Sequence, residues 1–211
     1  MQFIAHRGYW LDPTEKNSKQ AFLRALTHNF GIETDFRDHN GRLVVSHDPA
    51  SDSAMPASDF AKLYQAHPVS APMALNIKAD GLSRWIKDFI NSSQIRHCFA
   101  FDMSVPEMLP YIATKIPIYT RLSEHEEYPA LLDQSAGVWL DAFEKQWYDD
   151  TLIINLLTEK KRIALVSPEL HGREHLTFWK FIRSSNLHRY ETMSLCTDFP
   201  LEARNFFHGS N

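Results

Sequence analysis

The sequence predicts an α/β protein with the (β/α)8 TIM-barrel fold, because strand-like runs alternate with segments of helical period along the whole chain. A chain of 211 residues is near the lower size limit for this fold, so we expect one compact domain spanning residues 1–211. Eight runs have the length and composition of β-strands. They are FIAHR (3–7), IETDF (32–36), MALNIK (73–78), HCFAFDM (97–103), IPIYTRL (116–122), GVWLDAF (137–143), RIALVS (162–167) and ETMSLCT (191–197).

Segments of helical period separate these runs. They cover residues 18–29, with Ser18 as the expected N-cap, then 58–67 behind Ser58, 82–93, 105–115, 128–135, 147–161 and 174–185. An open, doubly wound sheet would show the same alternation. Against that fold, no glycine-rich phosphate loop follows the first run, and the chain contains only seven glycines.

One additional element interrupts the alternation after the second predicted strand. The segment RDHNGRLVVSHD (37–48) places Asn40-Gly41 between two extended runs, which predicts a tight β-hairpin. The hairpin would return His47 to roughly the level of Glu33 and Asp35. Its register does not follow from the sequence.

Composition and charge exclude several classes of function. The net charge is −4, the pI is about 6.2 and there is no basic run, so we expect no nucleic-acid partner. No apolar run is long enough for an integral membrane segment and no signal peptide is evident, so we expect a cytoplasmic protein. Cys98 and Cys196 lie in apolar runs, which argues against a disulfide or a cysteine metal site. The oligomeric state does not follow from the sequence.

Two carboxylates stand out on the second predicted strand. Glu33 and Asp35 are two positions apart, so their side chains point to the same face. In an apolar interior they would repel one another unless a cation compensated them, and Mg²⁺ or Ca²⁺ prefers such oxygen ligands. The plainer alternative is a strand end with two solvated acids.

Basic and imidazole side chains occur at neighbouring strand ends. His6 ends the first run and His47 ends the hairpin, so both can reach one mouth of a barrel, where two imidazoles can serve as base and acid. Arg7 and Lys78 also follow apolar runs. Two cations beside a metal ion suit a phosphate group, although a lone lysine at a strand end is most often a solvated surface residue.

These residues together resemble a known family. IAHRG (4–8), KNSKQAFLRAL (16–26) and GIETDFRDHNGRLVVSHDPA (31–50) resemble the start of the glycerophosphodiester phosphodiesterases, which belong to the phospholipase-C-like phosphodiesterase barrels. The shared elements are His6-Arg7, Glu33-x-Asp35 and His47-Asp48, in this order. The resemblance continues more weakly through NIK (76–78), FAFD (99–102) and TDFP (197–200).

The resemblance implies a role for each matching residue. His6 and His47 would be the acid–base pair, Glu33 and Asp35 would bind a divalent cation (Mg²⁺ or Ca²⁺), and Arg7 and Lys78 would contact the phosphate of a small-molecule phosphodiester. In the mechanism usual for the family, a neighbouring hydroxyl of the substrate attacks phosphorus and leaves a cyclic phosphate that water can open.

The chain departs from the family pattern in three places. Asn76 stands where the family has a third acidic metal ligand. The asparagine keeps an oxygen ligand but removes a negative charge. Metal binding should therefore be weaker, unless Asp102, Asp141 or Glu169 also contributes a carboxylate. The signature Pro-Glu-Asn-Thr reads EKNS at 15–18. Only 28 residues separate His47 from Asn76, which leaves little room for the insertion domain of many members and implies a more open mouth for a bulkier or different substrate.

A loop after the seventh predicted strand carries further polar residues. In PELHGRE (168–174), Glu169, His171 and Arg173 could line a pocket for the leaving group, and an ordinary polar loop is an equal alternative. Trp139 and Asp141 could also bind substrate, although a tryptophan on a barrel strand is more often core.

Three functions remain open at this stage. The first is a metal-dependent phosphodiesterase that acts on glycerophosphodiester-like substrates. The second is a lyase-type enzyme that stops at the cyclic phosphate, or one specific for a polymer-linked or sugar-linked diester. The third is a non-catalytic phosphate-binding domain, which would not require two histidines.

Overall fold

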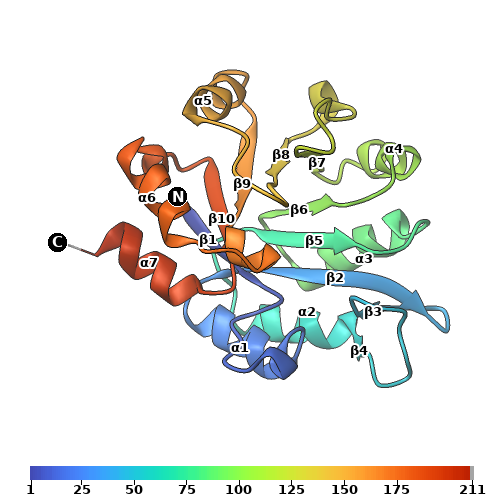
Figure 1. Cartoon of the computed structure of the whole chain (residues 1–211). Coiled ribbons are helices and arrows are strands. Elements are labelled where there is room, and N and C mark those ends of the chain that lie inside the picture. The colour runs from blue at the N-terminus through green and yellow to red at the C-terminus, as the bar shows by residue number, and fades with distance from the viewer. Residues whose placement is uncertain (210–211) are drawn as a thin grey trace.

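Eight parallel strands close into a barrel in the structure, a computed structural model that describes residues 1–209. Each strand pairs with the next barrel strand along the chain, except that a single bridge between Ala100 and Ile118 joins β6 to β7. The last strand pairs with the first, which completes the ring (Figure 1). The predicted fold class is therefore confirmed. The barrel strands are β1 (Gln2–His6), β2 (Gly31–His39), β5 (Met73–Ile77), β6 (Cys98–Phe101), β7 (Tyr119–Leu122), β8 (Gly137–Leu140), β9 (Arg162–Val166) and β10 (Met193–Thr197).

Helices surround the barrel on its outside (Figure 1). Ser18 caps the first of them as predicted, because its Oγ accepts a hydrogen bond of 3.2 Å from the Ala21 amide. In residues 1–209, no helix combines the length and apolarity that crossing a membrane requires. The helices are α1 (Lys19–Thr27), α2 (Ala57–Ala66), α3 (Ser83–Ser93), α4 (Val105–Ala113), α5 (Asp150–Thr158), α6 (Leu176–Ser184) and α7 (Pro200–His208).

Three features of the helices differ from the sequence prediction. The segment 128–135 holds only a 3-10 turn at Leu132–Gln134, because Leu131 adopts a left-handed backbone (φ 53°) that an α-helix does not tolerate. Helix α2 begins at Ala57 behind Pro56, so Ser58 lies inside it and does not cap it. Helix α7 was not predicted, although Pro200 at its first position is a helix-start signal.

The predicted hairpin is present. Strand β3 (Arg42–Val45) runs antiparallel to β2, and β4 (Met55–Pro56) adds to its other edge. Asn40 and Gly41 form the turn with φ values of 48° and 73°, and two positive values in succession are what a tight hairpin turn requires. The amide of Ser46 donates to the carbonyl of Asp35 over 3.0 Å, which places His47 one residue beyond this contact.

Apolar side chains fill the barrel interior beneath a polar mouth. The inward positions of β1, β5 and β10 carry Ile4, Ala74 and Cys196. His6, Asn76 and Asp198 each follow one of these inward residues by two positions, so they lie on the same face of their strands. The polar positions lie at the carboxyl ends of the strands, where barrels carry their functional groups. The remaining members of the apolar layer are Phe99, Phe101, Tyr119, Trp139, Ala164 and Val166.

Trp139, a candidate substrate contact, is part of this layer. Its side chain is buried and stacks on Phe101 with 4.0 Å between ring centroids. Trp139 therefore forms the floor of the barrel interior, which is the core alternative considered for it.

Candidate active site

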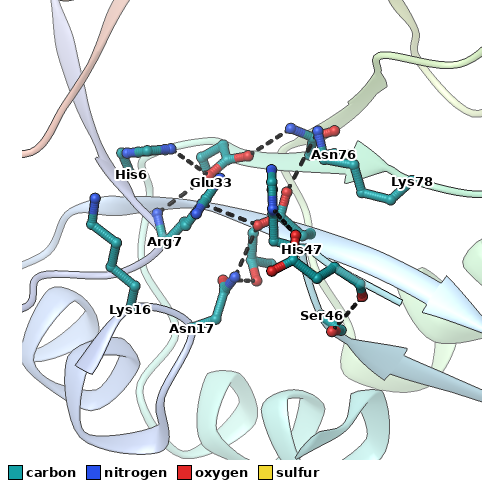
Figure 2. Close-up of polar contacts among 12 residues, drawn as sticks. His6, Arg7, Lys16, Asn17, Glu33, Ser46, His47, Asn76 and Lys78 are labelled. Atoms are coloured by element: carbon teal, nitrogen blue, oxygen red, sulfur yellow. Dashed lines mark hydrogen bonds and ion pairs between the residues drawn. The ribbon is translucent and has the colours of Figure 1, made fainter. Parts of the chain in front are cut away.

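His6 lies at the mouth between two carboxylates. Strands β1 and β2 pair His6 with Glu33, and the imidazole Nε2 is 3.9 Å from Glu33 Oε2 (Figure 2). On the other side, Nδ1 is 2.7 Å from Asp198 Oδ1, at the end of β10. A carboxylate on one ring nitrogen fixes the ring orientation and leaves the other nitrogen for proton transfer. The closure of the barrel, which brings β10 beside β1, creates this arrangement.

Arg7 leaves the strand in an uncommon backbone conformation. Its φ is 54°, in the left-handed region that non-glycine residues seldom adopt. In this conformation its amide donates to the Glu33 carbonyl over 2.9 Å and to Glu33 Oε2 over 3.2 Å. Its guanidinium Nε is 3.2 Å from Asp35 Oδ2. Arg7 therefore contacts both carboxylates of β2, and such strained residues recur at functional sites.

Asp35 is fully buried and surrounded by donors. Besides Arg7, the side chain of Asn17 donates to its Oδ2 over 2.8 Å, and Lys78 Nζ lies 3.7 Å from its Oδ1. Asn17 also accepts a hydrogen bond from the Thr34 hydroxyl over 2.9 Å. Asn17, the asparagine retained in EKNS, thus ties the loop after β1 to the carboxylate strand.

The tie through Asn17 predicts a measurable loss of stability. Asn17 has φ 59°, which asparagine and glycine tolerate better than alanine. We expect Asn17→Ala to lower the free energy of unfolding by about 2 kcal/mol, which corresponds to a decrease of about 4–8 °C in Tm. The loss is expected because buried Asp35 loses a hydrogen-bond donor and the backbone at position 17 becomes strained. Asn17→Gly is the matched variant and should lose less, because it removes only the side-chain bonds. Thermal unfolding by circular dichroism measures both, and equal stability of all three proteins would contradict the assignment.

Glu33, Asp35 and Asn76 supply the oxygen atoms at the mouth that could hold a hard divalent cation. Asp35 pairs with Asn76 across β2 and β5, and Asn76 Nδ2 donates to Glu33 Oε1 over 3.0 Å. Asp35 Oδ1 and Asn76 Oδ1 are both buried and accept no hydrogen bond. Buried oxygens without a donor are costly unless a cation or water meets them, and Mg²⁺ and Ca²⁺ prefer such ligands. Within residues 1–209, no group of three or more His, Cys, Asp or Glu side chains has metal-site spacing, so the set depends on the Asn76 amide.

Burial alters the protonation of two groups at the site. Burial raises the pKa of Glu33 above its usual range, and the negative charge of Asp35 raises it further, while His6, Asn76 and Arg7 partly offset the effect. Burial likewise lowers the pKa of Lys78, opposed by Asp35 and Glu33. Both shifts disfavour the charged forms. A bound cation next to Glu33 would favour the ionised carboxylate.

Lys78 follows β5 and belongs to a second charged group. Its Nζ is 3.0 Å from Asp102 Oδ2, and Asp102 in turn pairs with Arg121 at the end of β7. Asp102 also has a positive φ, of 72°. Each oxygen of Asp102 accepts a hydrogen bond from a cation, whereas Asp35 Oδ1 accepts none, so Asp102 has no oxygen left to complete the metal set in place of Asn76.

His47 lies at the mouth on the hairpin, more exposed than His6. Its Nδ1 is 2.9 Å from Asp48 Oδ1, and its side chain is 44% exposed. The backbone carbonyl of His47 accepts a hydrogen bond of 3.0 Å from Arg37, which holds the end of the hairpin. Figure 2 shows the His47 ring projecting from the hairpin on the side of β2 that carries the site. Among residues 1–209, Asp48 is its only ion-pair partner.

The other predicted substrate contacts lie on the loop after β9. Glu169 Oε1 accepts hydrogen bonds from the Thr197 hydroxyl and, over 3.1 Å, from the Asp198 amide. His171 Nε2 is 2.7 Å from Asp141 Oδ1, which joins the 3-10 turn Pro168–His171 to the residue that follows β8. Arg173 donates to the Ala142 carbonyl. Glu169 therefore connects to His6 through Asp198, whereas His171 belongs to the β8–β9 side of the mouth.

Three residues at the mouth were not assigned from the sequence. Asp198 holds His6, Arg121 holds Asp102, and Lys16 Nζ lies 3.8 Å from Asp198 Oδ2. Asp198 and Arg121 stand two positions beyond the inward residues Cys196 and Tyr119, which is a usable signal once the strand face is known. Lys16 follows a short 3-10 turn, and no periodicity indicates where its side chain points.

Solved structures with this fold include several phosphodiesterases. A candidate glycerophosphodiester phosphodiesterase from Galdieria sulphuraria superposes over 98% of this chain and 97% of its own, with a TM-score of 0.75 and 13% identity. An Oleispira antarctica phosphodiesterase in complex with the product sn-glycerol-3-phosphate matches over 98% and 96% with a TM-score of 0.59 and 12% identity. A Ca²⁺-dependent phosphatidylinositol-specific phospholipase C from Streptomyces antibioticus matches over 98% and 95% with a TM-score of 0.55 and 11% identity.

These likenesses confirm the family resemblance at the level of the fold. No protein-family model matches the chain, and no curated protein matches its sequence. Because identities of 11–13% establish a shared barrel and not a shared reaction, the chemistry has to be argued from the site.

Proposed function

We propose that the protein is a divalent-cation-dependent phosphodiesterase that cleaves glycerophosphodiester-like small molecules, with His6 and His47 as the acid–base pair. The observation that carries this proposal is the contact network at one barrel mouth. There His6 stands beside Glu33, and Arg7 and Lys78 stand beside Asp35. Structural neighbours whose names describe phosphodiester cleavage support the reaction class.

The basic side chains suit a phosphate diester. Arg7 and Lys78 approach Asp35 from two sides, and each side chain retains an exposed fraction of about a fifth. An anionic ligand at the mouth would therefore meet partly exposed cations, and charge-assisted hydrogen bonds to phosphate are among the stronger polar contacts. Glu169 and His171 are proposed to contact the remainder of the substrate.

The two histidines would divide the proton transfers. One imidazole accepts the proton of a substrate hydroxyl while its oxygen forms a bond to phosphorus. The other imidazole donates a proton to the departing alkoxide as the P–O bond to the leaving alcohol breaks. The products are an alcohol and a five-membered cyclic phosphate. Addition of water across one P–O bond then gives the phosphate monoester and restores both imidazoles.

Glu33, Asp35 and Asn76 are proposed to hold Mg²⁺ or Ca²⁺. When bound there, the cation would neutralise charge on the phosphoryl oxygens. The name of the Streptomyces phospholipase C, which specifies Ca²⁺ dependence, supports a divalent cation in this barrel type. The unsatisfied oxygens of Asp35 and Asn76 provide the support from this chain.

Restoring the third carboxylate should tighten cation binding. We expect Asn76→Asp to lower the Kd for Mg²⁺ or Ca²⁺ by about tenfold, because affinity at oxygen sites follows the number of charged ligands. Isothermal titration calorimetry measures the Kd. Asn91→Asp, at an exposed position on α3, is the control for a general change of charge. Unchanged or weaker binding in Asn76→Asp would mean that Asn76 is not a ligand.

Turnover of diesters tests the proposed reaction. The wild-type protein is incubated with sn-glycero-3-phosphocholine, sn-glycero-3-phosphoethanolamine and an aryl phosphodiester, in Mg²⁺, Ca²⁺, Mn²⁺ or EDTA. We expect cleavage of the two glycerol diesters, which carry the neighbouring hydroxyl that the mechanism needs; EDTA should abolish this cleavage and a divalent cation should restore it. Cleavage of the aryl diester alone would point to direct attack by water. Accumulation of the cyclic phosphate would identify a lyase-type enzyme. Binding of phosphate without turnover of any diester would favour the non-catalytic alternative.

A further inference from the structure

A groove of about 440 Å³ lies beside His6, one of the two proposed catalytic residues. Tyr9, Trp10 and Leu11, from the loop after β1, form one wall. Asp198, Phe199 and Leu201, at the entry to α7, form the other. Its size is within the range of small-ligand sites. The proposed reaction assigns no ligand to this groove.

The groove shares two of its lining residues with the proposed catalytic network. Asp198 contacts His6 Nδ1 at 2.7 Å, and the Trp10 indole donates to the His6 carbonyl over 3.2 Å. Lys16 Nζ lies 3.8 Å from Asp198 Oδ2 and 4.6 Å from the centroid of the Trp10 ring. Figure 2 shows the Lys16 side chain extending toward His6. A phosphate at His6 would therefore lie close to the part of the groove that Asp198 and Trp10 line.

Large apolar side chains of the groove are left exposed to solvent. Leu11 is 68% exposed and Phe199 is 38% exposed. Exposed apolar residues scattered singly are common, but these two belong to one concave surface beside a charged site. Such surface is stabilised when an apolar group covers it.

We infer that this groove binds an apolar chain on one alcohol of the substrate, so that the protein prefers an amphipathic, single-chain phosphodiester. The inference rests on the proposed phosphodiesterase function. Its basis is complementarity: Lys16, beside the groove residues Asp198 and Trp10, supplies positive charge next to the groove. The groove residues Leu11, Phe199 and Leu201 supply the apolar surface. Glu202, also in the groove wall, has an exposed carboxylate that water can solvate.

A series of substrates that differ only in chain length tests the inference. The substrates are sn-glycero-3-phospho esters of methanol, butanol and hexanol, assayed as monomers with the divalent cation that supports turnover. We expect kcat/KM to rise about twofold for each added methylene, which is roughly half the effect of complete burial, because the groove is open on one side. The hexyl ester should therefore exceed the methyl ester by about thirtyfold. Equal values for the three esters would overturn the inference while leaving the phosphodiesterase function intact.

A leucine variant assigns the effect to the groove. Leu11→Gln should lower the hexyl-to-methyl ratio of kcat/KM by about threefold, because one wall becomes polar. Leu109→Gln, on the outer side of α4 and similarly exposed at 52%, is the matched control and should leave the ratio unchanged. An unchanged ratio in Leu11→Gln would remove the groove from the explanation.

Two further measurements separate the remaining outcomes. If no diester is turned over, calorimetric binding of hexyl phosphate and methyl phosphate still tests the groove. Tighter binding of hexyl phosphate than of methyl phosphate, with the difference lost in Leu11→Gln, supports the inference. Equal binding of the two compounds to the wild type refutes it. The choline ester is also compared with its neutral 3,3-dimethylbutyl isostere. A preference for choline without any chain-length dependence would refute the apolar chain and indicate a cation subsite at Asp198 and Glu202.

Discussion

Replacing His6 with alanine is expected to lower kcat for a glycerophosphodiester by roughly a hundredfold to ten-thousandfold, the contribution typical of a positioned acid or base. Asp198 holds the imidazole at 2.7 Å and Glu33 lies 3.9 Å from it, so the substitution removes a proton-transfer group that the site holds in a fixed position. Steady-state kinetics at saturating divalent cation measures the loss. Cation binding should persist, since His6 is not among the proposed ligands.

A second histidine provides the control. His67 follows α2 at the end that leads into β5, away from the mouth, and its side chain is exposed. His67→Ala should retain wild-type kcat. A His6→Ala protein that turns over substrate at the wild-type rate would contradict the assignment, and an equal loss in both variants would point to damage to the fold.

Replacing Glu33 with glutamine is expected to remove cation binding and to stabilise the cation-free protein. Saturating cation at a hundredfold excess over its Kd should stabilise the wild type by about 2.7 kcal/mol, which raises the Tm by about 5–11 °C. Glu33→Gln should show none of this increase. Differential scanning fluorimetry with and without Ca²⁺ or Mg²⁺ measures both proteins, with exposed Glu127→Gln as the control that should respond like the wild type.

The gain in cation-free stability follows from the sign of the pKa shift. Burial, followed by the charge of Asp35, raises the folded-state pKa of Glu33 above 4.5. An acid with a raised folded-state pKa contributes stability below its unfolded-state pKa and loses that contribution as the pH rises through the folded-state value. At neutral pH, which lies above the unfolded-state pKa, burying the Glu33 carboxyl therefore costs free energy that glutamine, which does not titrate, avoids. A variant less stable than the wild type in EDTA at pH 7 would contradict this account.

The parts of the site that can be predicted from the sequence are those that depend on local backbone geometry. Glu33 and Asp35 share a face because strand side chains alternate, and their burial at the mouth agrees with that spacing. Asn40-Gly41 specifies the hairpin because both residues accept the positive φ values of its turn. The barrel itself follows from the alternation of strand-like runs with segments of helical period.

The parts that were missed depend on contacts between distant segments. The partner of His6 is Asp198, on the opposite end of the chain, and only the closure of the barrel through β1 and β10 brings the two together. A local conformation caused the error at 128–135, where Leu131 adopts a left-handed backbone that no spacing of apolar residues reveals. Lys16 and Trp10 lie on an irregular loop, where periodicity carries no information about side-chain direction.

The most direct measurement of the central claim is a ³¹P NMR time course of sn-glycero-3-phosphocholine with the wild-type protein and with His6→Ala, each in Ca²⁺, in Mg²⁺ and in EDTA. The account predicts that the diester signal is replaced by a cyclic phosphate or a monoester only with the wild type and a divalent cation. Two results would contradict the account. One is disappearance of the diester at the same rate with His6→Ala as with the wild type. The other is an unchanged spectrum with the wild type in both cations, together with no cleavage of the methyl, butyl and hexyl esters.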